Sequence, residues 1–151
     1  MPAPWRLVGT FFGTGASPIM PGTCGSLAAA ALIVWIPGPA YGVAVGALAV
    51  VATLTGPRIA DRMIRESGRK DPQDFVLDEA AGVWIAAFRP ENPGLWAVAV
   101  ALVVFRVLDI LKPWPIRRIE QLPGGIGVVY DDVFAGLIAL GAGLIIERVP
   151  L

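Results

Sequence analysis

Apolar residues along the chain gather in five blocks that contain no charged residue. These blocks cover residues 27–36, 40–54, 80–88, 95–105 and 133–146. A full membrane span needs about 20 residues, so blocks of this length fit either short membrane segments or buried helices. Small residues recur four apart, as at Gly42 and Gly46, and this spacing lets helices pack closely in a bilayer. We therefore expect a membrane bundle, with a tightly packed soluble bundle as the alternative.

The stretch from 57 to 67 has a different pattern, with Ile59 and Met63 on one face and arginines mainly elsewhere. Pro57 suits a first helical turn and Gly68 suits the position just after a helix. This stretch predicts a short amphipathic helix that connects apolar helices near acidic lipid. The expected fold is all-α: a single domain over residues 1–151, forming a compact membrane bundle of about five short apolar helices plus this one.

The basic residues are distributed unevenly if the five blocks alternate in direction. Ten of the 12 then lie on the side that holds the N-terminus and the stretches 56–79 and 106–132, and only Arg89 and Arg148 lie opposite. The positive-inside rule makes the first side cytoplasmic. Residues 1–26 contain several prolines and no continuous apolar core, so no secretory signal is expected.

Composition narrows the chemistry that such a bundle can carry out. Hydrophobic residues make up 56% and charged residues 16% of the chain, and the net charge is zero, so we expect no nucleic-acid partner. There is no histidine and a single cysteine, which excludes an internal disulfide, a Cys/His zinc site and a histidine base. Acid–base and metal chemistry must therefore come from carboxylates, lysine and arginine.

Acidic residues stand at three ends of apolar blocks on the predicted cytoplasmic side. They are Asp78 and Glu79, Asp109, and Asp131 and Asp132. One acid of each pair can cap a helix N-terminus, but capping does not explain the whole set. A cluster of carboxylates is stable around a hard cation, and ligation by oxygen alone favours Mg²⁺ or Mn²⁺.

Cationic residues flank these acids. Arg106 and Asp109 are neighbours on one helical face, and Lys112 follows three residues later. These three residues form a polar stripe along the helix. The stripe is either a buried ion-pair ladder or an anion clamp in which Arg106 and Lys112 hold a phosphate. Two glycine-rich stretches, at 13–26 and 123–127, are either simple turns or loops whose backbone N–H groups bind an anion.

Phosphate chemistry without histidine leaves few mechanisms. Cys24 lacks the arginine six residues later that a cysteine phosphatase loop needs, because position 30 is alanine. A carboxylate-bound metal with an activated water or a carboxylate nucleophile remains. The segments FFGTGASPIMPGTCGSLAA, DFVLDEAAGVWIA and FRVLDILKPWPIRRIEQLPGGIGVVYDDVFAGL resemble the phosphatidylglycerophosphatase A family over most of the chain.

The resemblance implies a Mg²⁺-dependent enzyme of the bacterial inner membrane. Its substrate would be phosphatidylglycerophosphate, which loses its terminal phosphate to give phosphatidylglycerol. The polar positions that match the family motifs are Ser17, Thr23, Ser26, Asp78, Glu79, Arg106, Asp109, Lys112, Arg117, Asp131 and Asp132.

Roles for these residues are hypotheses from their chemistry. We expect Glu79, Asp131 and Asp132 to ligate Mg²⁺, with Asp78 or Asp109 completing the site. Arg106 and Lys112 are expected to neutralise the phosphoryl oxygens, while Ser17, Thr23, Ser26 and Arg117 contact substrate. Two other interpretations remain: a soluble helical phosphatase acting on a non-lipid phosphoester, and a metal-binding membrane protein without catalysis. The sequence does not indicate the oligomeric state.

Overall fold

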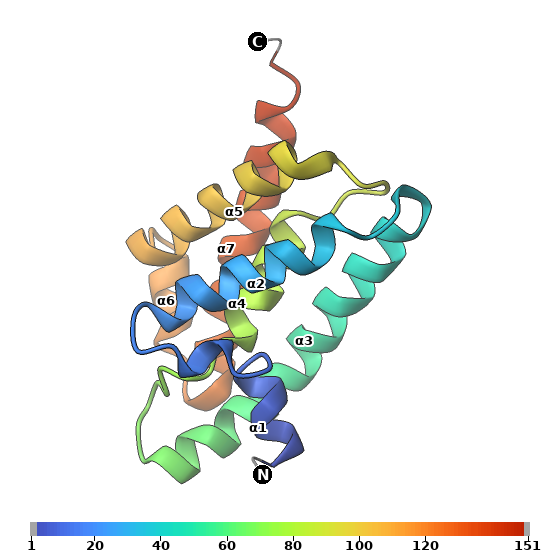
Figure 1. The fold of residues 1–151 in the computed structure, drawn as a ribbon. Coiled ribbons are helices and arrows are strands. Elements are labelled where there is room, and N and C mark those ends of the chain that lie inside the picture. The colour runs from blue at the N-terminus through green and yellow to red at the C-terminus, as the bar shows by residue number, and fades with distance from the viewer. Residues whose placement is uncertain (1–2, 150–151) are drawn as a thin grey trace.

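The computed structural model describes residues 3–149, and every regular element in that range is a helix. The predicted all-α class is therefore confirmed. The elements in chain order are α1 (Pro4–Gly9), the 3₁₀ turn η1 (Thr14–Ala16), α2 (Pro21–Val34), α3 (Gly38–Ser67), α4 (Leu77–Ala86), α5 (Gly94–Leu111), α6 (Ile116–Glu120) and α7 (Gly124–Ile146) (Figure 1).

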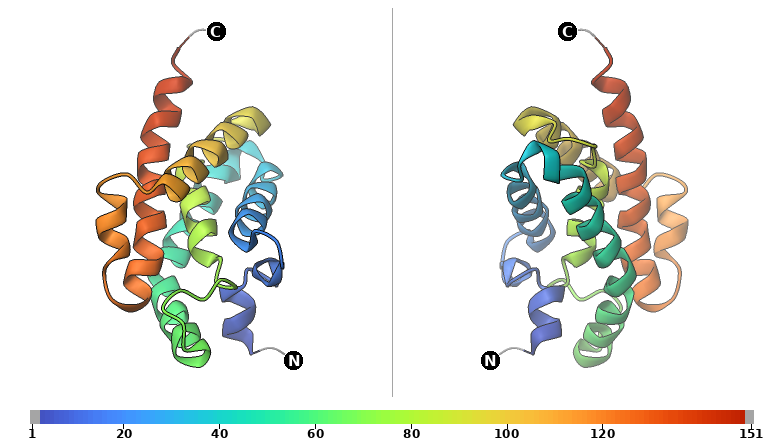
Figure 2. Two further views of the ribbon diagram at one scale, coloured as in Figure 1. Left: turned by 90° about the vertical axis from the view of Figure 1, so that its left-hand side faces the viewer. Right: turned by 90° about the vertical axis from the view of Figure 1, so that its right-hand side faces the viewer.

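The short helix α4 lies at the centre of the bundle. It packs against α2, α3, α5 and α7, and Figure 2 shows it between α2 on one side and α7 on the other. Eight of its 10 residues are buried, among them Ala80, Ala81, Val83 and Trp84. A helix that is apolar on all sides is stable only when other helices enclose it. The bundle is therefore organised around α4.

Three of the helices, α3, α5 and α7, are long and apolar enough to cross a membrane. The apolar blocks at 27–36 and 80–88 instead lie mainly in α2 and α4, which have 14 and 10 residues. At about 1.5 Å per residue these two helices are shorter than the bilayer core of about 30 Å. Packing inside the bundle therefore accounts for the apolar residues of α4, while the lengths and composition of α3, α5 and α7 suggest a membrane protein.

The surface of the bundle includes an exposed apolar ridge on α5. Val103, Val107 and Leu111 are four residues apart and are exposed by 61%, 48% and 65%. Trp35, at the end of α2, and Trp96, in the first turn of α5, are exposed by 83% and 73%. Exposed apolar and aromatic side chains in this arrangement are typical of contact with lipid tails and with the membrane interface.

The structure differs from the sequence prediction at Pro57, which lies inside α3 instead of beginning a separate helix. Proline cannot donate to the carbonyl four residues earlier, so it usually ends or kinks a helix. Here one face of α3 stays buried across the proline, at Ala52, Gly56, Ala60 and Met63. Continuous packing of that face offsets the lost hydrogen bond. The predicted end of the helix is confirmed, because Gly68 adopts a left-handed φ of 68° and its N–H donates to the Ile64 carbonyl.

Candidate active site

The crossing of α4 and α7 brings two acidic segments together. A Cβ on Gly136 would lie 2.6 Å from the Gly82 carbonyl oxygen, and a Cβ on Gly82 would lie 2.9 Å from the Asp132 carbonyl oxygen. The two backbones are therefore as close as glycine permits. Asp78 precedes Gly82 by one helical turn, and Asp132 precedes Gly136 by one turn. The glycine crossing thus places the carboxylates of α4 beside those of α7.

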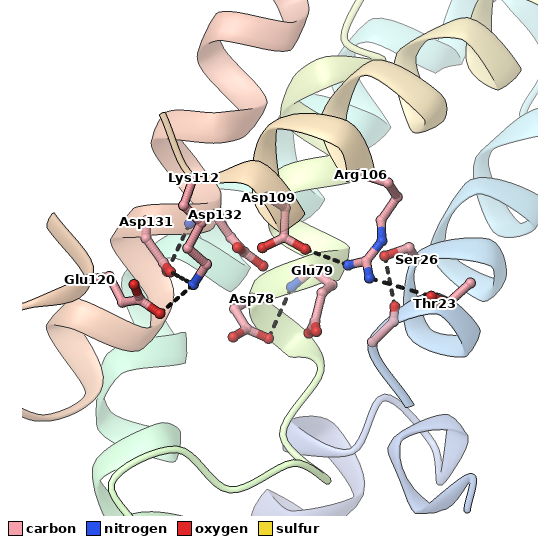
Figure 3. Close-up of polar contacts among 11 residues, drawn as sticks. Thr23, Ser26, Asp78, Glu79, Arg106, Asp109, Lys112, Glu120, Asp131 and Asp132 are labelled. Carbon is pink, nitrogen blue, oxygen red and sulfur yellow. Dashed lines mark hydrogen bonds and ion pairs between the residues drawn. The ribbon is translucent and has the colours of Figure 1, made fainter. Parts of the chain in front are cut away.

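Asp78, Glu79 and Asp132 form the acidic cluster of the site (Figure 3). Each offers a carboxylate oxygen, and these oxygens all lie within 4.8 Å of one another. Asp78 and Asp132 are only 7% and 4% exposed. The Glu79 Oε2 atom is buried and has no hydrogen-bond partner among the described residues. A buried carboxylate oxygen without a partner is costly, so three acids with one such oxygen fit a hard divalent cation ligated by oxygen.

Burial changes the acidity of this cluster. Burial, reinforced by the neighbouring Glu79, raises the pKa of Asp78 well above its ordinary value of 3.8. Burial likewise raises the pKa of Glu79 above its ordinary value of 4.5. A group with a raised pKa resists carrying negative charge, and a bound cation favours its ionised form.

Arg106 stands on one side of the acidic cluster. Its Nη1 pairs with Asp109 Oδ2 at 2.6 Å, and its Nη2 donates to Thr23 Oγ1 at 3.3 Å. The predicted contact across one helical turn of α5 is therefore confirmed. A Cβ on Gly22 would overlap the Glu79 carboxylate and lie 3.5 Å from Arg106 Nη1. Glycine at position 22 thus leaves room for the first turn of α2 to lie directly against these two side chains.

Lys112 stands on the other side of the cluster. Its Nζ donates to Asp131 Oδ2 at 2.7 Å and to Glu120 Oε1 at 2.6 Å. Burial lowers the pKa of Lys112, but the hydrogen bonds to Asp131 and Glu120 outweigh burial and raise the pKa above its ordinary value of 10.5. Lys112 therefore remains a cation. An ammonium has three donors, so one N–H remains for a substrate oxygen.

The acidic cluster, Asp109 and Lys112 line one cavity of about 250 Å³, and Arg106 lies behind Asp109 outside that lining. Its residues come from the segment before α4, the start of α4, the end of α5, α6 and the first half of α7. They are Lys70, Asp71, Asp78, Glu79, Asp109, Lys112, Glu120, Gln121, Val128, Asp131 and Asp132. Four of these residues were not predicted as site residues: Lys70, Asp71, Glu120 and Gln121. The only sequence signal for Glu120 and Gln121 is the pair of prolines at 113 and 115, which indicates that the chain turns just after Lys112.

The predicted substrate-contacting residues are dispersed. Thr23 contacts Arg106, but Ser26 is fully buried and its hydroxyl donates to the Gly22 carbonyl at 2.8 Å. The Ser17 hydroxyl donates to the Ile19 carbonyl at 2.9 Å within its loop. Arg117 lines a separate groove beside the cavity. The cavity is therefore built from carboxylates and lysines, without these four side chains in its lining.

The glycine-rich stretches also take a different form from that expected. Residues 124–127 form the first turn of α7, so Asp131 and Asp132 lie two turns inside the helix rather than at its start. A Cβ on Gly125 would overlap the Pro57 carbonyl, and one on Gly127 would overlap the Leu122 carbonyl. These glycines therefore allow α7 to pack closely against its neighbours.

The chain is similar to known proteins over nearly its whole length. The family description Phosphatidylglycerophosphatase A matches residues 7–147. Phosphatidylglycerophosphatase A of Escherichia coli is 38% identical over 146 residues, with 93% of this chain and 82% of that protein covered. Phosphatidylglycerophosphatase A of Haemophilus influenzae is 36% identical over 140 residues, with 91% and 85% covered.

A putative phosphatidylinositol-3-phosphatase of Bacteroides thetaiotaomicron is 41% identical over 139 residues, with 87% of this chain and 86% of that protein covered. No solved structure matches the chain. The family match covers far more than half of the chain, and the two enzymes named phosphatidylglycerophosphatase A each cover more than nine-tenths of it. The chain belongs to the phosphatidylglycerophosphatase A family.

Proposed function

We propose that this protein is a Mg²⁺-dependent lipid phosphatase that converts phosphatidylglycerophosphate to phosphatidylglycerol and phosphate. Family membership and the names of the Escherichia coli and Haemophilus influenzae relatives support the reaction. The observation that carries the proposal is the buried cluster of Asp78, Glu79 and Asp132, with its unpartnered Glu79 oxygen, between two cationic side chains. Carboxylates and cations in one cavity suit a phosphomonoester held between metal and positive charge.

Asp78, Glu79 and Asp132 would hold the magnesium ion, which when bound polarises the phosphate and lowers the pKa of a bound water. Hard oxygen donors are the ligands that Mg²⁺ prefers. Asp131 was predicted as a further ligand. Its ion pair with Lys112 supports a different role, in which Asp131 fixes the direction of that ammonium.

Arg106 and Lys112 would bind the phosphoryl oxygens. Each is already fixed by a carboxylate, Arg106 by Asp109 and Lys112 by Asp131 and Glu120. Fixed cations stabilise the charge that builds up as the ester bond breaks without first having to reorient. Thr23 holds the second nitrogen of Arg106 and would act through it.

The proposed location is the bacterial inner membrane, with the cavity open to the cytoplasm. Two observations support this placement. Three helices are long enough to cross a bilayer, and ten of the 12 basic residues lie on one side when the apolar blocks alternate. A lipid that carries its phosphomonoester in the cytoplasmic headgroup layer would meet both the apolar helices and the cavity.

The test is phosphate release by the purified protein in detergent, with and without Mg²⁺. The substrates are phosphatidylglycerophosphate, phosphatidylinositol 3-phosphate and a water-soluble phosphomonoester. Hydrolysis of the first, with Mg²⁺ required, supports the proposal. Preference for phosphatidylinositol 3-phosphate would favour the activity named for the Bacteroides relative. Preference for the soluble ester, or recovery of the protein without detergent, would favour a soluble phosphatase.

The matched variants are Asp132→Asn and Glu79→Gln in the cluster and Asp74→Asn outside it. Asp74 pairs with Arg6 and does not line the cavity. The cluster variants should insert into the membrane but lose turnover, while Asp74→Asn should keep it. Normal activity in both cluster variants would refute the metal assignment. Mg²⁺ binding without any phosphatase activity would favour a non-catalytic metal-binding protein.

A further inference from the structure

A second, more open groove of about 630 Å³ lies beside the acidic cavity. Lys112 and Gln121 line both, so the two compartments adjoin. The groove is formed by the end of α5, the following turn and α6. Its residues are Leu111, Lys112, Pro113, Trp114, Arg117, Arg118 and Gln121.

The two compartments carry opposite charge. The cavity is lined by seven carboxylates and two lysines, whereas the groove is lined by one lysine, two arginines and no carboxylate. Arg117 and Arg118 are exposed, and neither forms an ion pair or a side-chain hydrogen bond within residues 3–149. The groove therefore suits an anionic group directly, whereas the carboxylates of the cavity need a bound cation between them and a phosphate. Guanidinium groups bind phosphate oxygens in a bidentate way, which makes a phosphate a good match.

The groove also lies beside the exposed apolar ridge of α5. Leu111 lines it and is the last residue of the exposed α5 ridge that includes Val103 and Val107. Trp114, which also lines it, is 79% exposed. Tryptophan beside an apolar ridge is typical of the headgroup level of a membrane. A lipid with its tails along this ridge would thus bring its headgroup to the groove.

We infer that the basic groove binds the phosphodiester of the lipid substrate while the terminal phosphomonoester occupies the acidic cavity. This inference rests on the proposed function, because that substrate carries both phosphates, joined by one glycerol. Two adjoining compartments that share Lys112 correspond to two phosphates separated by a short linker. Arg117 and Arg118 then select lipids that have a phosphodiester between the diacylglycerol and the reacting phosphate.

The test compares Arg117→Gln/Arg118→Gln with a control, Arg65→Gln/Arg69→Gln. The control removes the same charge from exposed arginines that line neither compartment. Assays use neutral-detergent micelles that hold at most one phosphatidylglycerophosphate molecule each, so that no other anionic lipid is present. The groove variant should raise KM about tenfold or more while kcat stays within about twofold, since a charge-assisted hydrogen bond contributes a factor of this size.

Two inhibitors separate the compartments. Phosphatidylglycerol has the phosphodiester alone, so its inhibition constant should rise as much as KM in the groove variant. Inorganic phosphate should inhibit the groove variant, the control and the unmodified protein equally. If the groove variant loses inhibition by inorganic phosphate as much as inhibition by phosphatidylglycerol, the arginines act in the reaction cavity and the inference is overturned. A fall in kcat at constant KM would have the same meaning.

Two further measurements complete the design. An effect that appears only in vesicles rich in anionic lipid, and equally in the control, would show general membrane attraction and also overturn the inference. Calorimetric binding of phosphatidylglycerol in micelles does not depend on turnover. If the unmodified protein fails to hydrolyse phosphatidylglycerophosphate, the proposed function fails. Weaker phosphatidylglycerol binding by the groove variant would then still support a phosphodiester site, and unchanged binding would exclude one.

Discussion

Replacing Gly82 with alanine should disrupt the site without changing any polar side chain. The added methyl would overlap the Phe105 ring and lie 2.9 Å from the Asp132 carbonyl oxygen, where ordinary contact begins at 3.4 Å. Phe105 is 0% exposed and has little room to move. The helices α4 and α7 must therefore separate by about 0.5 Å or more near the cluster, the difference between those two distances. Overpacking of this kind costs about 1–3 kcal/mol.

A shift of this size matters because metal-ligand distances are fixed to within about 0.2 Å. We expect Gly82→Ala to lower kcat about tenfold, because a misplacement of about 1 Å costs about 10²-fold and this shift is about half as large, and to raise the Mg²⁺ concentration for half-maximal activity. The assay is phosphate release against Mg²⁺ concentration, together with thermal unfolding. The control is Gly141→Ala on α7, where a Cβ would meet nothing within 4 Å. Unchanged activity and stability in Gly82→Ala would refute the role of the glycine crossing.

Three further predictions concern pH, Lys112 and the opposite end of the bundle. Because the pKa values of Asp78 and Glu79 are raised, the metal-free folded protein binds more protons than the unfolded chain, and its melting temperature should fall as pH rises from 5 to 8. Mg²⁺ should reverse that fall, so it should raise the melting temperature more at pH 8 than at pH 5. A larger rise at pH 5 than at pH 8 would contradict the reasoning. Glu120→Gln removes one ionic partner of Lys112 and should lower kcat about tenfold, with thermal stability as the check on folding. Glu147→Gln weakens the 2.7 Å ion pair between Glu147 and the buried Arg89, which does not line the cavity. It should therefore cost about 1–3 kcal/mol of stability and leave kcat unchanged.

The helices themselves were predictable because their signal is local. Continuous apolar blocks do form helices, and Gly68 ends α3 as its residue type suggested. The helix boundaries that were predicted wrongly depend on contacts between distant segments. Pro57 continues a helix because one face of α3 remains packed across it, and Gly125 is helical, in the first turn of α7, where its backbone lies against the Pro57 carbonyl. Neither contact leaves a periodic signal in the sequence.

Some contacts of the polar site are likewise predictable from local spacing, and others depend on how distant segments pack. The pairing of Arg106 with Asp109 follows from their spacing on one helix, so the sequence predicts it. The contact between Lys112 and Glu120 instead requires the chain to turn after α5 and return through α6, which has only five residues. So short an element has no apolar periodicity that would predict it. Glu120 was therefore missed, although it lies only eight residues beyond Lys112.

The adjacent acids Asp131 and Asp132 show why a sequence motif does not assign roles by itself. Neighbouring residues on an α-helix point about 100° apart, so they cannot face the same partner unless the partner lies between them. In α7, Asp131 turns to Lys112 at 2.7 Å, and Asp132 turns to Asp78 and Glu79. One acid therefore orients a cation while the other belongs to the candidate metal cluster. Replacing either should stop turnover, but only Asp132→Asn should weaken Mg²⁺ binding measured directly by calorimetry.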